Sequence, residues 1–281
     1  GIRGIEKTAK GFTFHSKGGD FYATKCIMAT GGKTLKKSGS DGSGFLYLES
    51  LGHHIIDLVP GLIGLKGKQS FFADIAGIRA DVKVDLYIES THVCSEQGEL
   101  QLTNYGISGI PVFQLSRVAT RALSEQKEVY ATLNFVPFWE KEQCLTYFKE
   151  RFKTADEKHI GEALIGFFPE KLIPVLLEES HIKAAKYANR LQTEELERFI
   201  ETVQGLRVDI TDWNTFDTAQ VTAGGVDTDE IDAETMESKI CPGLYFAGEM
   251  VDIDGICGGY NLQWAWSSGA VAGIHAAREL S

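Results

Sequence analysis

The alternation of hydrophobic and polar positions predicts strands in two separate parts of the chain. Residues 12–29 alternate short apolar runs with turn residues, which indicates a hairpin, turned at Gly18-Gly19-Asp20, that leads into a buried strand. Residues 81–89 alternate apolar and polar side chains with the period of a strand that has one solvated face. Together with the segments 99–102 and 129–135, this pattern predicts an antiparallel sheet.

Helical spacing accounts for most of the remaining middle positions. Pro111 suits the first turn of a helix, and residues 139–204 are typical of about three helices punctuated by Pro169 and Pro174. The segment Thr154-Ala155-Asp156-Glu157 matches a capping box, which is typical of the start of a helix. Near the end of the chain, a run rich in Ala, Gly and Ser predicts a last helix that begins near Leu262.

Glycine-rich segments on both sides of the middle region indicate a discontinuous domain. We expect residues 1–59 and 220–281 to form one domain, and residues 60–219 to form an inserted domain of antiparallel sheet plus helices. The expected fold class is therefore α/β, or α+β overall. The composition, with 43% hydrophobic and 24% charged residues among 281, is that of an ordinary globular protein.

Charge and apolar run length exclude two classes of partner. The net charge of −11 would repel a phosphate backbone, so we expect no nucleic acid. No apolar run approaches the ~20 residues of a membrane-spanning helix, so we expect no membrane. The five cysteines are far apart and form no C-x-x-C pair, which indicates neither a zinc site nor a disulfide framework. We therefore expect a cytoplasmic protein without a metal site.

The segment from Gly243 to Gln263 is the most informative for chemistry. Its pattern predicts a strand over Gly243–Glu249, a glycine loop that includes Gly258-Gly259, and a helix that starts near Leu262. Glu249 would lie at the carboxyl edge of a sheet, where it can accept hydrogen bonds from sugar hydroxyls. The helix N-terminus would favour a negatively charged ring or phosphate. The alternative is that these glycines serve turns and packing only.

These motifs resemble the BaiN-like family of flavoproteins, which belongs to the two-dinucleotide-binding-domain superfamily. The resemblance rests on Val221–Val226, Gly243–Glu249 and Gly258–Gln263, and extends upstream through Ala29–Gly32 and Gly106–Gly109. It implies an FAD-binding Rossmann-like domain interrupted by an insertion. The cofactor-binding residues that it implies are Ala29, Thr30, Gly31, Gly32, Gly248, Glu249, Gly258, Gly259, Tyr260, Asn261, Leu262 and Gln263.

One departure from the family pattern changes the expectation. Family members begin with a strand and a G-x-G-x-x-G turn that holds the FAD pyrophosphate, and this sequence has no such segment. Residues 39–44 have the wrong spacing for it. We therefore expect about 120 to 130 residues of an N-terminal FAD-binding segment to be absent, given the family's length and usual domain sizes.

Two functional hypotheses follow. The first is the C-terminal portion of an FAD-dependent oxidoreductase that acts on a small organic substrate, with NAD(P)H as a co-substrate. The alternative is a truncated or split flavoprotein fragment that binds no flavin alone and serves as a structural partner. No catalytic residue, substrate or oligomeric state can be assigned from the sequence.

Other residues are weaker candidates. Cys257 is either a redox thiol or, more in keeping with its lack of a partner cysteine, a packing residue. His53-His54 is interpreted as a surface or turn pair rather than a metal or acid–base site. The loop 103–109, with Arg117 beyond it, is either an anion-binding loop or a tight connection. The acidic residues of 227–234 lack the spacing of an EF-hand, which favours a solvated loop.

Overall fold

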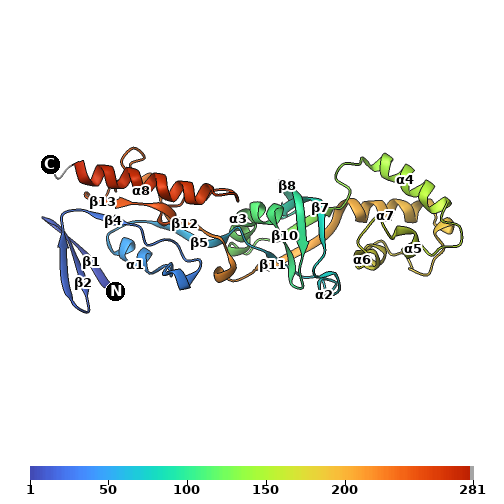
Figure 1. Ribbon diagram of the computed structural model, residues 1–281, viewed down its shortest axis with the longest axis horizontal. Helices are drawn as coiled ribbons and strands as arrows, with labels where there is room; N and C mark the ends of the chain where they lie inside the picture. The colour runs from blue at the N-terminus through green and yellow to red at the C-terminus, as the bar shows by residue number, and fades with distance from the viewer. Residues whose placement is uncertain (279–281) are drawn as a thin grey trace. The chain divides into compact units, whose positions relative to one another are not determined.

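The computed structural model describes residues 1–278 and divides the chain into two compact units (Figure 1). Unit 1 comprises Gly1–Ile63 and the described residues from Asn214 onward, and unit 2 comprises Gly64–Trp213. The sequence predicts domain boundaries after residues 59 and 219. The structure divides the chain after residues 63 and 213, four and six residues away. Each unit is described by itself below.

Unit 1 contains three small sheets. Strands β1, β2 and β3 form an antiparallel sheet, β5 and β12 an antiparallel pair, and β4 and β13 a parallel pair. The strands are β1 (Ile2–Thr8), β2 (Gly11–Ser16), β3 (Gly19–Ala23), β4 (Cys26–Met28), β5 (Ile55–Gly61), β12 (Val221–Val226) and β13 (Leu244–Phe246). The helices are α1 (Ser43–Ser50) and α8 (Tyr260–Arg278), with short turns of 3-10 helix at η1 (Lys36–Ser38), η3 (Phe216–Thr218), η4 (Thr228–Glu230) and η5 (Gly248–Met250).

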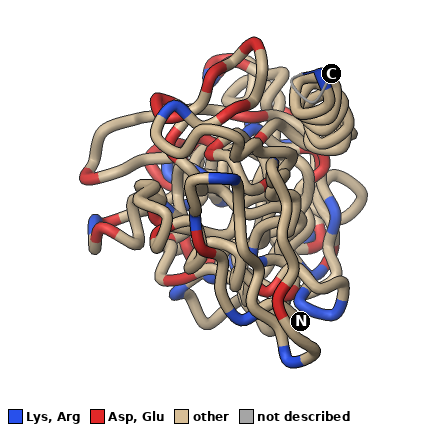
Figure 2. Tube along the Cα trace, turned by 90° about the vertical axis from the view of Figure 1, so that its left-hand side faces the viewer, with Lys and Arg blue, Asp and Glu red and all other residues tan. Residues whose placement is uncertain are grey.

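Helix α8 packs on the parallel pair through small side chains. Ser268, Ala272 and Ala276 are its buried residues and recur every four positions, so they share one face of the helix. Small side chains on that face let the helix lie close to the strands. No Lys, Arg, Asp or Glu occurs in α8 before Arg278, and Figure 2 shows this helix beside the C label as almost entirely tan.

Unit 2 is built on a closed antiparallel barrel of six strands. The strand order is β10-β11-β6-β9-β8-β7. In β7, Val82, Val84 and Leu86 are at most 1% exposed, whereas the residues between them are partly exposed, as the predicted alternation requires. The strands are β6 (Leu65–Gly67), β7 (Arg79–Ile88), β8 (Thr91–Leu102), β9 (Gly106–Gly109), β10 (Val129–Asn134) and β11 (Leu206–Trp213).

The helices of unit 2 complete its core. They are α2 (Phe72–Ile75), α3 (Ile110–Ser124), α4 (Lys141–Lys153), α5 (Ile160–Leu164), α6 (Leu172–Glu179) and α7 (Thr193–Gly205), with a 3-10 turn at η2 (Ala188–Arg190). Phe148 of α4 and Phe199 of α7 are fully buried, and their rings meet edge to face with centroids 5.4 Å apart. This aromatic contact joins two helices that are distant in sequence.

The predicted capping box at Thr154 is wrong. Thr154 is the C-cap of α4, and its hydroxyl donates to the carbonyl oxygens of Glu150 and Arg151. A Thr hydroxyl can bond backward to a preceding helical turn as well as forward to a following one, and sequence spacing does not distinguish the two cases. A capping box does occur five residues further on, where His159 precedes α5.

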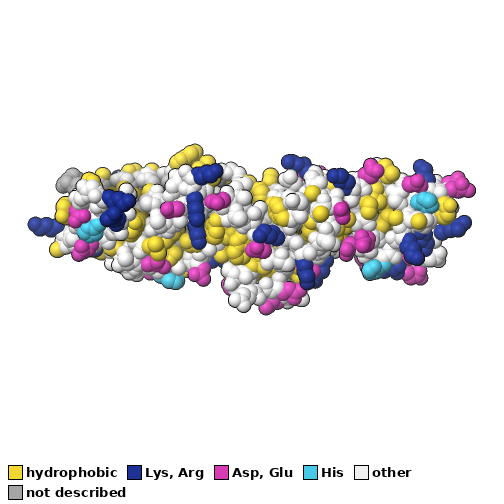
Figure 3. Space-filling model, turned by 90° about the horizontal axis from the view of Figure 1, so that it is seen from below, with side chains coloured by type: hydrophobic (Ala, Val, Ile, Leu, Met, Phe, Trp, Pro, Cys, Tyr) yellow, Lys and Arg dark blue, Asp and Glu magenta, His cyan; other side chains and the backbone are white. Residues whose placement is uncertain are grey.

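The predicted fold class is confirmed: the chain is a mixed α/β protein with an antiparallel insert, and that insert closes into a barrel. In the described part of the chain, no helix combines the length and apolar character needed to cross a membrane. Figure 3 shows acidic, basic and hydrophobic side chains interspersed on the face that it displays.

Candidate functional site

The two parallel strands of unit 1 end at the same edge of their sheet. Leu244 pairs with Cys26 and Phe246 pairs with Met28, so β4 and β13 run side by side in one direction. The segment Ala29–Gly32 follows β4, and Ala247–Glu249 follows β13. The carboxyl edge of parallel strands is where α/β folds bind ligands. The two motifs singled out from the sequence therefore meet at a candidate ligand site.

Glu249 ties these segments together. Its Oε2 accepts a hydrogen bond from the Gly32 amide at 3.1 Å, and its Oε1 accepts from the Thr222 amide at 2.5 Å and the Thr34 hydroxyl at 3.5 Å. A carboxylate offers about four acceptor positions. Three protein donors leave room for one more donor at this half-buried side chain, such as a ligand hydroxyl.

Thr222 and Thr30 complete the framework around Glu249. The Thr222 hydroxyl accepts from the Lys33 amide at 2.8 Å, and the Thr30 hydroxyl donates to the Met250 sulfur at 2.9 Å. Residues from three distant parts of the sequence therefore share one hydrogen-bonded network. We call the set Thr30, Gly32, Thr34, Thr222 and Glu249 the carboxylate cradle.

The cradle requires glycine at position 32. A Cβ atom there would lie 2.3 Å from the Thr222 hydroxyl oxygen and 2.9 Å from the Glu249 carboxyl carbon. Gly31 has a φ of 74°, a left-handed conformation that side chains disfavour. The backbone after β4 can therefore approach β12 and Glu249 closely only because both positions lack a side chain.

Gly248 connects the end of β13 to α8. Its amide donates to the Ser268 hydroxyl at 2.9 Å, and its carbonyl accepts from the Trp264 indole nitrogen at 3.0 Å. The two bonds anchor the backbone on which Glu249 stands. Trp264 is thus a packing and positioning residue, whereas Trp266 is 67% exposed.

The residues Gly258–Gln263 form the start of α8 and the loop before it. Gly258 and Gly259 have φ angles of 123° and 95°, and a Cβ at Gly259 would meet no atom within 4 Å. Asn261 closes the loop by accepting from the Gly255 amide and donating to the Gly255 carbonyl. Tyr260, Leu262 and Gln263 are exposed. The loop is open where the sequence expects a flat ring.

The last helix begins at Tyr260 rather than near Leu262. The Gln263 amide donates to the Gly259 carbonyl at 3.0 Å, so the helical hydrogen bonds already start at the glycine pair. Apolar spacing places a helix by its buried face, and the first turn of α8 is mostly exposed. The sequence pattern therefore placed the start of the helix two residues too late.

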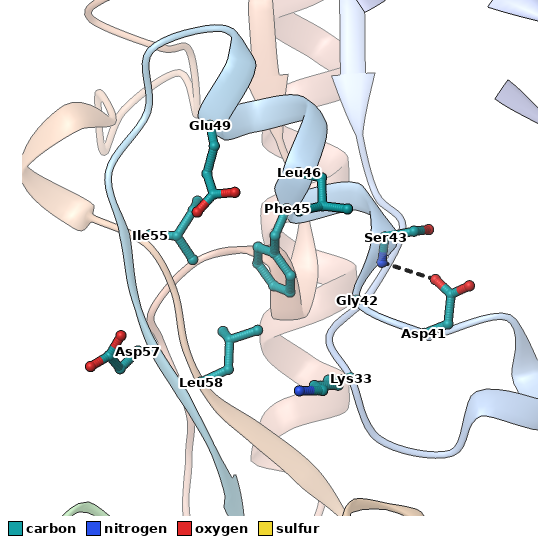
Figure 4. A pocket seen from close by; sticks show the side chains of 10 residues that line it. All are labelled: Lys33, Asp41, Gly42, Ser43, Phe45, Leu46, Glu49, Ile55, Asp57 and Leu58. Carbon is teal, nitrogen blue, oxygen red and sulfur yellow. Dashed lines mark hydrogen bonds between the residues drawn. The ribbon is translucent and has the colours of Figure 1, made fainter. Parts of the chain in front are cut away.

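A cavity of about 470 Å³ lies beside the loop that follows the cradle (Figure 4). Phe45 and Leu58 supply apolar walls, and Lys33 supplies a cation. Its remaining lining residues are Asp41, Gly42, Ser43, Leu46, Glu49, Ile55 and Asp57. Asp41 accepts a hydrogen bond from the Ser43 amide at 3.0 Å. One oxygen of this carboxylate is therefore already used at the start of α1.

The structure gives the environment of three other candidates named from the sequence. His53 lies in the turn after α1, which is one of the two expected alternatives, but it is only 4% exposed and is therefore not a surface residue, while His54 is exposed. The hydroxyl of Thr103 bonds within its own loop, to Gly106 and Tyr105, which accounts for that loop as a tight connection. Cys257 is a partly buried free thiol. Residues 1–278 hold no cluster of three or more His, Cys, Asp or Glu suited to a metal ion.

Asp227, Glu230 and Asp232, in the acidic segment, accept hydrogen bonds from the protein itself. Asp227 accepts from the Asp229 amide, and Asp232 accepts from the amides of Glu234 and Thr235. These bonds lower the pKa of both aspartates. Glu230 bonds to the two histidines. The carboxylates therefore organise backbone turns at the surface of unit 1.

Cys26 gives unit 1 a testable pH dependence. Burial, reinforced by the nearby Cys241, raises the pKa of the Cys26 thiol from 9.0 to about 11. Because the folded pKa exceeds the unfolded one, the thiol's contribution to stability is complete below pH 9 and is lost as the pH rises towards 11. We expect urea unfolding to show a smaller loss in Cys26→Ala than in the wild type, because burial also raises the pKa of Cys241, which still titrates in the variant. Identical slopes for both proteins between pH 9 and 11 would contradict it.

Comparison with known proteins finds a family and three relatives that match nearly the whole chain. The family model described as HI0933-like protein Rossmann domain matches residues 1–275. The chain is 44% identical over 276 residues to a 3-dehydro-bile acid delta(4,6)-reductase from Clostridium scindens. It is 28% and 27% identical to ribosomal RNA dihydrouridine synthases from Escherichia coli and Haemophilus influenzae.

These alignments cover nearly all of this chain but only part of each relative. They include 98%, 95% and 90% of the chain, respectively. The chain spans 68% of the reductase and 64% and 60% of the two synthases.

Proposed function

The chain belongs to the HI0933-like family of Rossmann-domain proteins, and from that premise we propose that it carries one part of the FAD site of an oxidoreductase. The resemblance to the BaiN-like flavoproteins points the same way. In this proposal, the cradle around Glu249 and the loop before α8 hold different portions of one FAD molecule.

The observation that carries the proposal is the cradle at the carboxyl edge of β4 and β13. It combines a carboxylate that retains acceptor capacity with a backbone that approaches closely at Gly31 and Gly32. A sugar-like chain of hydroxyls, such as the ribityl portion of FAD, fits that combination because hydroxyls donate to carboxylates. We assign this role to Glu249, with Ala29 and Thr30 beside it.

The loop before α8 is proposed to face the isoalloxazine ring. At Gly259 a Cβ atom would meet nothing within 4 Å, so a flat ring can approach the backbone there, while the Tyr260 ring lies beside Gly258. The amides of Tyr260, Asn261 and Leu262, which precede the first helical hydrogen bond at Gln263, carry the partial positive charge of a 19-residue helix. They would stabilise negative charge on a ring held against them.

Flavin supplies hydride transfer when it is bound, and the residues of this chain orient it and adjust its electrostatic surroundings. Glu249 fixes the backbone at Gly32 and Thr222, because the amides of both residues donate to its carboxylate. Trp264 and Ser268 fix Gly248, which carries Glu249. No residue of the chain is assigned as a proton donor or acceptor for the substrate.

The substrate is proposed to be a small organic molecule, with NAD(P)H as the reductant. The name of the Clostridium scindens relative favours a 3-dehydro-bile acid or a chemically similar compound. The RNA synthases are less similar, and a net charge of −11 does not favour contact with phosphate backbones. We therefore place the small-molecule reductase first.

Part of the flavin site is proposed to come from a segment outside these 281 residues. Within the described chain, β4 pairs with β13 alone, and Ile27 in the middle of β4 is 42% exposed. A parallel sheet is ordinarily buried and extended on both sides. One further parallel strand beside β4 would extend the carboxyl edge, and an element packed on the opposite face of the sheet from Cys26 and Met28 would cover Ile27.

The test is a visible absorption spectrum of the purified chain after FAD is added and unbound flavin is removed. The measurement is repeated in the presence of the separately produced remainder of the bile acid reductase. A perturbed flavin band with the chain alone supports binding by this portion itself, and a band only with the second fragment supports the split site. A folded protein that stays colourless in both cases would contradict the proposed FAD site and favour a purely structural role.

A further inference from the structure

A chain of three polar side chains, two of them buried and the third partly exposed, lies next to the strand that leads to Glu249. The Ser238 hydroxyl lies 3.0 Å from His53 Nε2, and His53 Nδ1 lies 2.7 Å from Glu230 Oε2. His53 and Ser238 are each 4% exposed. A neutral imidazole with its proton on Nδ1 satisfies the set, because it donates to Glu230 and accepts from Ser238. We call these residues the histidine lock.

The lock has the order of a nucleophile, base and orienting acid, but its surroundings exclude that chemistry. A nucleophilic serine needs access to substrate and free backbone donors near the attacked carbonyl. Here the Ser238 oxygen already accepts from the amides of Cys241, at 2.7 Å, and Ile240, at 3.2 Å. The two amides that could serve as oxyanion-hole donors therefore donate to the Ser238 oxygen instead.

The lock instead supports the outer edge of β13. Glu237 forms an antiparallel bridge with Tyr245, and the Ser238 amide donates to the Leu244 carbonyl at 2.7 Å. The Phe246 amide donates to the Met236 carbonyl at 3.0 Å. Segment 236–238 therefore lies along β13 on the side away from β4, and Ser238 is the residue of this segment that His53 holds.

His53 also contacts β13 directly. Its ring meets Phe246 edge to face, with centroids 5.0 Å apart. Phe246 is the last residue of β13, and Gly248 and Glu249 follow it. A shift of His53 or Ser238 would thus be transmitted through β13 to the backbone that carries Glu249, because packed side chains and strand pairing leave little room for independent movement.

We propose that His53 is a positioning residue that acts through Ser238 and β13 to hold Glu249 in the carboxylate cradle. An effect of His53 on cofactor binding rests on the proposed function, whereas the effect of His53 on the position of Glu249 can be measured without flavin. His53 joins the turn after α1 to the acidic segment and β13, which lie far along the chain from that turn.

Two substitutions separate the halves of the lock. His53→Asn keeps a donor near the position of Nδ1 for Glu230 but does not reach Ser238. His53→Gln places its amide nearer the position of Nε2, so it retains a contact for Ser238. We expect His53→Asn to disturb the cradle and His53→Gln to restore most of it. His54→Ala is the adjacent control, because its side chain is exposed.

The readout is residue-resolved hydrogen exchange of the Gly32 and Thr222 amides, which both donate to Glu249. In His53→Asn we expect these two amides to exchange on the order of tenfold faster, while the Phe14 amide in β2 keeps its wild-type rate. Ser238→Ala should reproduce the effect. The double variant should add little to it, since contacts in one network are not additive.

Several outcomes would overturn the proposal. If every amide of unit 1 accelerates equally, His53 contributes only to global stability. If the Gly32 and Thr222 amides keep their rates, or if His53→Gln is as disturbed as His53→Asn, Ser238 does not transmit the effect. None of these outcomes depends on FAD, so a failure of the flavin proposal would be seen separately in the absorption spectrum.

Discussion

Replacing Gly32 with alanine is expected to destabilise unit 1 by about 3 kcal/mol, at the upper end of the usual cost of overpacking. The new methyl carbon would lie 2.3 Å from the Thr222 hydroxyl oxygen and 2.7 Å from its Cβ. On its other side it would lie 2.9 Å from the Glu249 carboxyl carbon. Neither neighbour can retreat without breaking its own hydrogen bonds, so the loop after β4 must move out.

The displaced loop should also impair function. In the proposed complex of this chain, the second fragment and FAD, we expect the rate of flavin reduction by NAD(P)H to fall on the order of 100-fold, because a displacement of about 1 Å is enough to misalign reacting groups. Urea unfolding measures the stability and stopped-flow reduction measures the activity. Gly273→Ala in α8 is the matched control, since its Cβ would meet nothing within 4 Å. Equal behaviour of the two variants would rule out a steric role for Gly32.

Glu249→Ala is expected to cost a similar amount for a different reason. The amides of Gly32 and Thr222 and the hydroxyl of Thr34 would lose their shared acceptor in a partly buried place. Hydrogen bonds to a charged group contribute about 1.5–3 kcal/mol each, and their losses are not additive here, so we expect roughly 3 kcal/mol in total. Retention of FAD should weaken at least tenfold as well, which corresponds to about 1.4 kcal/mol.

The control for Glu249 is another glutamate of unit 1. Glu49 in α1 is exposed, and Glu49→Ala should change the free energy of unfolding by less than about 0.5 kcal/mol. Glu249→Gln keeps one oxygen acceptor but turns an amide donor towards other donors, so it should lie between wild type and Glu249→Ala. A fully stable Glu249→Ala protein with unchanged flavin content would remove this residue from both the framework and the site.

Glu249 also illustrates a difference between sequence and structure. Its position after a buried strand in a Gly-Glu pair marked it as a ligand-binding acid. From the sequence alone, the loss of its side chain should affect the cofactor and leave folding intact. The structure adds three internal donors to the carboxylate, and folding is therefore expected to suffer together with binding. Donors at positions 32, 34 and 222 cannot be assigned to one acceptor from their spacing along the chain.

His53 shows the same limit more sharply. The sequence favours a surface or turn pair for the two histidines that follow Gly52. Only the folded chain brings Glu230 and Ser238, which are 177 and 185 residues away in sequence, onto the two nitrogens of one ring. The local pattern carries no signal for such contacts.

The sequence by itself determined the fold class, the family and the local elements, because alternation, helical spacing and glycine motifs depend on near neighbours. It correctly predicted the strand before Ala29–Gly32 and the strand before Glu249. Tertiary structure alone decided that the antiparallel insert closes into a barrel and that Gly32, Thr222 and Glu249 share hydrogen bonds. It also decided that His53 is buried against β13. These features arise from packing between segments far apart in the chain, where complementary shape and unpaired hydrogen-bonding groups, rather than local propensity, select the arrangement.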